Sequence, residues 1–228
     1  MSSPRNLRRI IIFAVLMALF IAAVPMLVLA KSGGPHSDNG WHLGQDPRFF
    51  VPEPNPDALQ QISDLESAND LENAELINKM VNTPQAIWFE SGTPEMVKLD
   101  VMETVKRSQK EHRVPILVAY NLPFRDCAQF SAGGATTVEE YKAWFDGFVA
   151  GIGNAKVVVI LEPDGLGIIP WYTNLEGNLE WCQPDEANPE TAAAERFEML
   201  NYAVDVLKAK PQARVYLDST HSAWLNVG

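Results

Sequence analysis

The sequence predicts an α/β protein built on a parallel sheet, and three observations support this fold class. From residue 84 onward, short apolar runs alternate with longer segments of helical periodicity. The central run, residues 157–161, is continuously apolar and mostly β-branched, as expected of a strand buried on both faces. Acidic residues follow three of the runs, and this edge of a parallel sheet is where ligands bind.

The elements are expected in a regular order along the chain. Residues 49–51 begin the ordered part, and residues 57–80 have helical spacing with a break at Asn69 and Asp70. Strands and helices then alternate, which implies right-handed crossovers between parallel strands. The expected strands are 86–89, 115–120, 157–161 and 213–217, and the expected helices are 93–112, 137–152 and about 188–208.

Two of these helices carry clear start signals. Thr93 is the expected N-cap of the first, with Pro94 at the first helical position. Thr137 opens the second with Glu140 three residues later, which is the pattern of a capping box.

Four strands cannot close a barrel, and the pattern ends just after the fourth strand. The sheet is therefore either open or the front part of a longer barrel. Asp126 follows the second strand, Glu162 and Asp164 follow the third, and Asp218 follows the fourth. Acids gathered on one edge are typical of a barrel active site.

The first thirty residues form a targeting segment. Three arginines precede an uncharged apolar run over residues 10–30, which ends in a sequence resembling a cleavage site. The run is long for a signal peptide and about long enough to span a bilayer, so a cleaved signal peptide and an uncleaved membrane anchor both stay open. In either case we expect the body to be exported, as a secreted protein or anchored on the outer face of the plasma membrane. Residues 31–48 are rich in Gly, Ser, Asn and Asp and predict a linker.

The charge balance excludes one class of partner. The 228 residues carry a formal net charge of −11, and without the first thirty residues 15 basic side chains face 29 acidic ones, a charge of −14. Such an acidic body argues against nucleic acid as a ligand. No glycine-rich phosphate loop follows a strand, which argues against a nucleotide cofactor.

The two cysteines, Cys127 and Cys182, leave two possibilities open. In an exported chain they can form one disulfide, and otherwise they are free thiols. Without paired histidines they make a poor zinc site, and no metal is expected.

Clustered carboxylates with tryptophans suggest glycoside hydrolysis. One acid must stay protonated to donate to the leaving oxygen, and nearby acids raise its pKa by repulsion. The apolar faces of sugars stack on flat aromatic rings, and Trp88 lies at the expected edge.

Two motifs resemble the signatures of a known family. Residues 120–127 (YNLPFRDC), followed by SAGG at 131–134, resemble the first signature of glycoside hydrolase family 6, the inverting β-1,4-glucanases and cellobiohydrolases. Residues 158–166 (VVILEPDGL) resemble the second. Residues 216–218 with His221 and Trp224 are similar to a third segment. The resemblance covers about 49–228, and it implies a parallel β/α barrel of the distorted TIM type, here incomplete, with about four strands.

The resemblance implies the following roles at the reacting bond. Asp164 is the general acid. Asp126 is the neighbouring acid that keeps Asp164 protonated and helps to handle the proton of the attacking water. Tyr120 presses on the sugar at the cleavage point and favours its distortion.

Further residues are implied in support and in substrate binding. Ser131, or Ala132 in its place, lies in a mobile loop that closes over the sugar, and Asp218 supports the acid network. The resemblance also implies a disulfide between Cys127 and Cys182. Side chains expected to line glucosyl subsites are Trp88, His221 and Trp224. Glu162 is expected to be structural, paired with Arg125 or Lys156.

We therefore expect a monomeric β-1,4-glucan hydrolase that acts with inversion and without a cofactor. The family barrel has about seven strands, so we expect this chain to be the N-terminal part of a catalytic domain, poorly soluble and weakly active alone. One alternative is a non-catalytic glycan-binding surface protein or an inactive fragment of such an enzyme. Another is a membrane-anchored α/β protein without a glycan role.

Overall fold

The computed structural model describes residues 48–221. The predictions for residues 1–30, most of the linker and Trp224 lie outside the described residues. Among residues 48–221, no helix is long and apolar enough to cross a bilayer.

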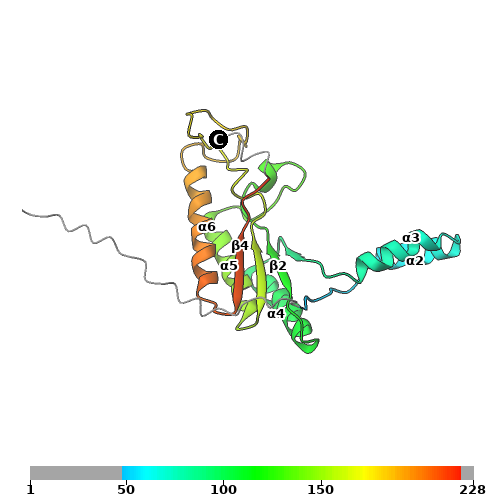
Figure 1. The fold of residues 1–228 in the computed structure, drawn as a ribbon. Coiled ribbons are helices and arrows are strands. Elements are labelled where there is room, and N and C mark those ends of the chain that lie inside the picture. The colour runs from blue at the N-terminus through cyan, green and yellow to red at the C-terminus, as the bar shows by residue number, and fades with distance from the viewer. Residues whose placement is uncertain (1–47, 222–228) are drawn as a thin grey trace, which may run out of the picture. The chain divides into compact units, whose positions relative to one another are not determined.

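A four-stranded parallel sheet organises the described residues (Figure 1). Its strands lie side by side in chain order, and each pairs in parallel with the next. They are β1 (Ile87–Phe89), β2 (Ile116–Ala119), β3 (Val157–Leu161) and β4 (Ala213–Leu217). The predicted sheet is confirmed, and the bounds of β3 and β4 are those expected.

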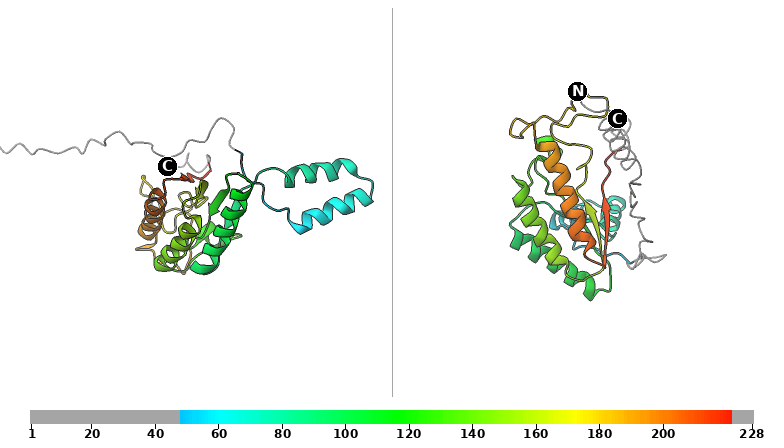
Figure 2. Two further views of the ribbon diagram at one scale, coloured as in Figure 1. Left: turned by 90° about the horizontal axis from the view of Figure 1, so that it is seen from below. Right: turned by 90° about the vertical axis from the view of Figure 1, so that its left-hand side faces the viewer.

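Three helices connect successive strands and lie together on one side of the sheet (Figures 1 and 2). They are α4 (Pro94–Lys110), α5 (Val138–Ile152) and α6 (Ala192–Lys208). A doubly wound sheet has helices on both faces, whereas a β/α barrel has them on the outer face alone. This arrangement therefore follows the winding of a barrel.

The core lies between the sheet and these helices. Helix α5 is central to it, with the Phe148 ring 5.6 Å from Phe89 of β1 and 5.8 Å from Trp144. Alternate strand residues such as Leu117, Val159 and Leu161 face the same cluster and are fully buried. The residues between them form a cross-strand row, Trp88, Val118, Ile160 and Tyr216, on the opposite face.

The helix starts agree with the sequence signals. The Thr93 hydroxyl accepts from the Met96 N–H at 3.2 Å, and the Thr137 hydroxyl accepts from the Glu140 N–H at 3.1 Å. The carboxylate of Glu140 binds the N–H of Thr136 at 2.9 Å, one residue earlier than in a standard capping box. Hydrogen bonds from Thr136 lower the pKa of Glu140.

The predicted helical segment before β1 is two helices, α2 (Pro56–Ser67) and α3 (Leu71–Val81). They are separated where expected, because Asn69 has a left-handed φ of 60° and Asp70 caps α3. Helix α6 begins at Ala192, later than the predicted 188, because Asn188 first forms a turn in which its side chain accepts from the Glu190 N–H at 2.9 Å.

Gly147 sets the approach of α5 to α4. A Cβ at this position would lie 2.1 Å from the Pro94 carbonyl oxygen. We expect Gly147→Ala to lower the free energy of unfolding by about 1–3 kcal/mol, since overpacking outweighs the better helix propensity of alanine. Urea denaturation measures this, with Ala150→Ser on the exposed side of α5 as the control. Equal stability of both variants would contradict the close packing.

Candidate active site

Tyr120, Glu162 and Asp218 lie in one row at the carboxyl edge of the sheet. Each directly follows its strand, β2, β3 or β4. Their N–H groups donate to the carbonyl of the last residue of the neighbouring strand, at 2.9, 2.8 and 3.1 Å. The parallel ladder thus runs one residue beyond the strands, and this brings residues from three connections side by side.

Asp164 follows this row on a tight turn and is held by Asp218. Its backbone has a left-handed φ of 63°, and its N–H donates to Asp218 Oδ1 at 2.9 Å. The same oxygen accepts from the Thr220 N–H at 2.8 Å, and the Thr220 hydroxyl lies 3.4 Å from Asp164 Oδ1. Asp218 thus binds the turn that carries Asp164, and its role in support of the acid network stays a prediction.

The pKa of the Asp164 carboxyl is raised above its ordinary value. Burial is the largest cause, followed by the negative charge of Asp218 and, more weakly, that of Asp126. The hydrogen bond from Thr220 and, more weakly, the charge of His221 act in the opposite direction. The sequence assigned this effect to Asp126. In the structure Asp218 is the stronger of the two acidic neighbours, because it is bonded directly to the Asp164 turn.

This shift has a defined effect on stability. Because the folded-state pKa is raised, protonated Asp164 favours the fold below the ordinary pKa, and this contribution is lost as the pH rises through the raised value. Asp218→Asn keeps the capping oxygen but removes the charge. We expect it to lower the Asp164 pKa measured by carboxyl-carbon NMR titration, and by more than Asp126→Asn does. If Asp126→Asn lowered the Asp164 pKa by more than Asp218→Asn does, Asp126 would be the stronger of the two acidic neighbours.

Asp126 lies on a short 3-10 turn, η1 (Arg125–Ala128), in the connection after β2. Its φ is 51°, in the left-handed region, and its carboxylate accepts from the Ser131 N–H at 2.8 Å. Ser131, which was predicted to lie in a loop over the sugar, is exposed. Its backbone N–H makes this hydrogen bond to Asp126.

Tyr120 is 8% exposed and lies between an aromatic ring and a guanidinium. The Trp88 ring meets it edge to face at 5.5 Å, and the Arg125 guanidinium lies 4.9 Å from its ring centre. Burial raises the pKa of Tyr120, and the charge of Arg125 opposes this. Trp88 itself is 52% exposed, so its indole is open to a ligand.

The three residues predicted to be catalytic line one small cavity of about 10 Å³. Tyr120, Asp126 and Asp164 contribute to its wall, together with Glu162 and Arg196. This volume is at the lower limit for a single water molecule. The structure therefore brings Asp126 and Asp164, from the connections after the neighbouring strands β2 and β3, to one shared cavity. Among residues 48–221, no cluster of three His, Cys, Asp or Glu side chains is arranged to hold a metal ion.

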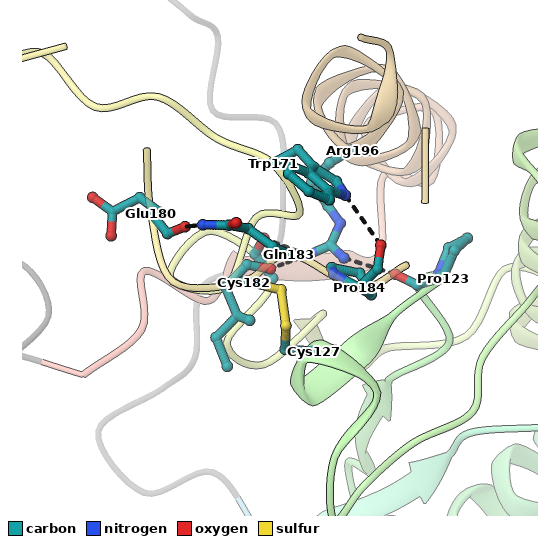
Figure 3. Close-up of a disulfide and its surroundings, with 10 residues drawn as sticks. Pro123, Cys127, Trp171, Glu180, Cys182, Gln183, Pro184 and Arg196 are labelled. Carbon is teal, nitrogen blue, oxygen red and sulfur yellow. Dashed lines mark hydrogen bonds between the residues drawn. A yellow bond between two sulfur atoms is a disulfide. The ribbon is translucent and has the colours of Figure 1, made fainter. Parts of the chain in front are cut away.

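The predicted disulfide between Cys127 and Cys182 is present (Figure 3). The two Cα atoms are 5.6 Å apart, and 55 residues separate the cysteines in the chain. Cys182 is buried, and its carbonyl accepts from the Trp171 N–H at 2.8 Å. The bond thus ties the turn that carries Asp126 to the long connection that follows Asp164.

Glu162 is structural as expected, but its predicted partner Arg125 was wrong. Its carboxylate is fully buried and accepts from the N–H groups of Asn121, at 3.0 and 3.1 Å, and Leu122, at 3.2 Å. The Arg125 guanidinium instead donates to three backbone carbonyls, each at 2.7 Å. Lys156, the other predicted partner, precedes β3 and so lies at the opposite end of the strand from Glu162. Burial raises the pKa of Glu162 to about 7.

Arg196 of α6 was missed by sequence reasoning. It is 2% exposed and lies on the apolar face of its helix, with Ala192, Met199 and Leu200. A single arginine in the middle of a helical apolar stripe is the signal that could have found it, since arginine is almost never fully buried unless it is paired.

Comparison with known proteins identifies the family of this site. The sequence matches the model of the family described as Glycosyl hydrolases family 6 over residues 45–227. The chain belongs to glycosyl hydrolase family 6. The resemblance of the two signature motifs is therefore confirmed, and the alternative that required both motifs to be accidental is excluded.

Several relatives in family 6 are endoglucanases. Endoglucanase 1 of Streptomyces sp. (strain KSM-9) is 35% identical over 150 residues, which are 65% of this chain and 38% of that protein. Endoglucanase A of Thermobispora bispora is 29% identical over 220 residues, which are 96% of this chain and 43% of that protein. The chain thus spans less than half the length of these relatives.

A solved family 6 structure shares the fold. The endoglucanase Cel6 from Mycobacterium tuberculosis, in complex with methyl-cellobiosyl-4-deoxy-4-thio-β-D-cellobioside, matches with a TM-score of 0.63 and 30% identity. The match covers 79% of this chain and 54% of that chain. The four-stranded sheet is therefore part of the distorted TIM-type barrel of family 6, and not an open doubly wound sheet.

Proposed function

We propose that this site serves the hydrolysis of β-1,4-glucosidic bonds in cellulose or related β-glucans, with inversion of configuration. The observation that carries the proposal is the environment of Asp164. Its carboxyl shares a cavity with Asp126 and Tyr120, is bonded through its backbone to Asp218, and has a raised pKa. A carboxyl with a raised pKa holds its proton to higher pH than an ordinary aspartic acid, and a glycosidase needs such a group as general acid.

In this mechanism Asp164 donates its proton to the glycosidic oxygen as the bond to the anomeric carbon breaks. Water attacks that carbon from the opposite face of the ring, and Asp126, whose carboxylate is held by the Ser131 N–H, accepts the proton that the water loses. Inverting enzymes leave about 6.5–9.5 Å between the acid and the base to admit this water. Tyr120 and the exposed Trp88 indole form the aromatic wall against which the sugar packs.

The experiment measures reducing-sugar release from soluble cellulose derivatives and the anomer formed, by proton NMR of fresh cello-oligosaccharide digests. We expect α-anomer to form first. Binding of cello-oligosaccharides is measured in parallel through tryptophan fluorescence, because Trp88 is exposed beside Tyr120. Binding without sugar release would support the glycan-binding alternative, and initial β-anomer would overturn the inverting mechanism.

We also infer that residues 1–30 direct export, that residues 31–48 are a linker and that residues 49–228 form the catalytic part, which acts as a monomer. The basic start and the apolar run over 10–30 support the export signal. N-terminal sequencing of the exported protein separates cleavage from anchoring, and light scattering measures the oligomeric state.

A further inference from the structure

We propose that Arg196 is a positioning residue. From helix α6 it binds the connection that carries Asp126 and the connection that carries Asp164, and so sets the placement of the two acids relative to each other. The inference rests on the proposed function for its catalytic consequence. Its structural basis is independent of that function, because it follows from hydrogen bonds to three carbonyl oxygens.

Arg196 binds both acid-bearing connections with one guanidinium. Its Nη2 donates to the Pro123 carbonyl at 2.7 Å, three residues before Asp126 (Figure 3). Its Nη1 donates to the Gly165 carbonyl at 2.9 Å, directly after Asp164, and to the Ile168 carbonyl at 2.8 Å. A planar guanidinium fixes its donors in one rigid fork, so the distance between the two connections follows from the geometry of a single side chain.

Glu162 joins the same two connections as Arg196 and carries the opposite charge. It starts the connection that carries Asp164, and it binds the N–H groups of Asn121 and Leu122 in the connection that carries Asp126. The negative charge of Glu162 stabilises the buried guanidinium of Arg196, whose pKa burial lowers to about 10. The two charges thus hold the same two connections, one through carbonyl groups and the other through N–H groups.

The burial of Arg196 excludes direct contact between its side chain and the substrate. The residue is 2% exposed and lies on the buried face of α6, so a bound sugar cannot reach it. It lines the small cavity shared by Tyr120, Asp126 and Asp164. Any effect of Arg196 on the reaction must therefore pass through the placement of these groups.

Arg196→Lys tests the proposal, because lysine keeps the charge but cannot bind three carbonyls in a fork. We expect kcat to fall about 100-fold, as for a misplacement of about 1 Å, while KM changes less than about threefold. The basic limb of the pH profile of kcat/KM should move to lower pH, because a loosened connection hydrates Asp164 and relieves its raised pKa. Loss of folded enzyme alone would lower the rate without moving this limb.

Hydrogen exchange supplies a readout that does not need activity. In Arg196→Lys the amides of residues 121–135 and 165–171 should exchange at least about tenfold faster, while those of α4 are unchanged. The matched control is Arg107→Lys, a partly exposed arginine on α4 that pairs with Glu53 at 3.1 Å. If the folded wild-type chain neither hydrolyses glucan nor binds cello-oligosaccharides, the proposed function fails and the exchange result still decides the positioning role.

A second variant covers the case in which Arg196→Lys does not fold. Glu162→Gln keeps an acceptor oxygen but loses the charge and one of the two oxygens that bind Asn121. This variant should speed amide hydrogen exchange more at residues 121–135 than at residues 165–171. The proposal would be overturned if a folded Arg196→Lys or Glu162→Gln variant had the same amide hydrogen exchange and the same pH profile of kcat/KM as the control Arg107→Lys.

Discussion

Asp164→Asn is expected to lower kcat for cello-oligosaccharide hydrolysis about 10³-fold, because it removes the only proton that the proposed general acid can donate. Asparagine has the same shape, and the backbone N–H that binds Asp218 is retained. Binding of cello-oligosaccharides should therefore stay within about twofold of wild type, since the lost interaction acts only in the transition state.

The control for this variant is Asp100→Asn, which changes an exposed carboxylate on α4. It should leave both kcat and binding unchanged. Substrates with a good leaving group add a sharper test, because they need little protonation: their hydrolysis should suffer less in Asp164→Asn than that of unactivated glucan. Undiminished turnover of unactivated glucan by Asp164→Asn would remove Asp164 from the role of general acid.

The double variant Cys127→Ser/Cys182→Ser is expected to lose about 4 kcal/mol of unfolding free energy. The estimate follows from releasing the closed loop of 55 residues in the unfolded chain. The loss should be larger than for Gly147→Ala, and it should be measured by urea denaturation at equal protein concentration.

Reduction of the wild-type protein is the matched control, because it opens the same bond without changing a side chain. Its stability should equal that of the double variant within experimental error. A double variant as stable as the oxidised wild type would mean that the long connection is held by its other contacts, such as the bond from the Trp171 indole to the Pro184 carbonyl at 3.1 Å.

Much of the fold could be predicted because its signals are local. The unbroken apolar run of β3 and the N-caps Thr93 and Thr137 depend on residues close in sequence, and the structure confirms each of them. The start of α6 was misplaced because the Asn188 turn competes with the first helical turn, and helical periodicity does not register such a turn.

The site could be predicted less completely, because its interactions join distant parts of the chain. The motif containing Glu162 indicated a structural carboxylate, but its partners lie 40 and 41 residues away and are backbone N–H groups, which carry no side-chain signal. Arg196 reaches a carbonyl 73 residues away. The stronger influence of Asp218 on Asp164 likewise depends on how closely β3 and β4 place their ends, which follows from the ladder and not from spacing along the chain.

The neighbouring positions of Asp126 and Cys127 link the chemistry of the site to the compartment in which the chain folds. The disulfide beside Asp126 forms in oxidising surroundings and is kept reduced in a cytosol. A chain retained there would lack the covalent link between the Asp126 turn and the connection after Asp164, and only hydrogen bonds would hold the two together. Oxidising surroundings, which the proposed export would supply, would add this covalent link between the connections that carry Asp126 and Asp164.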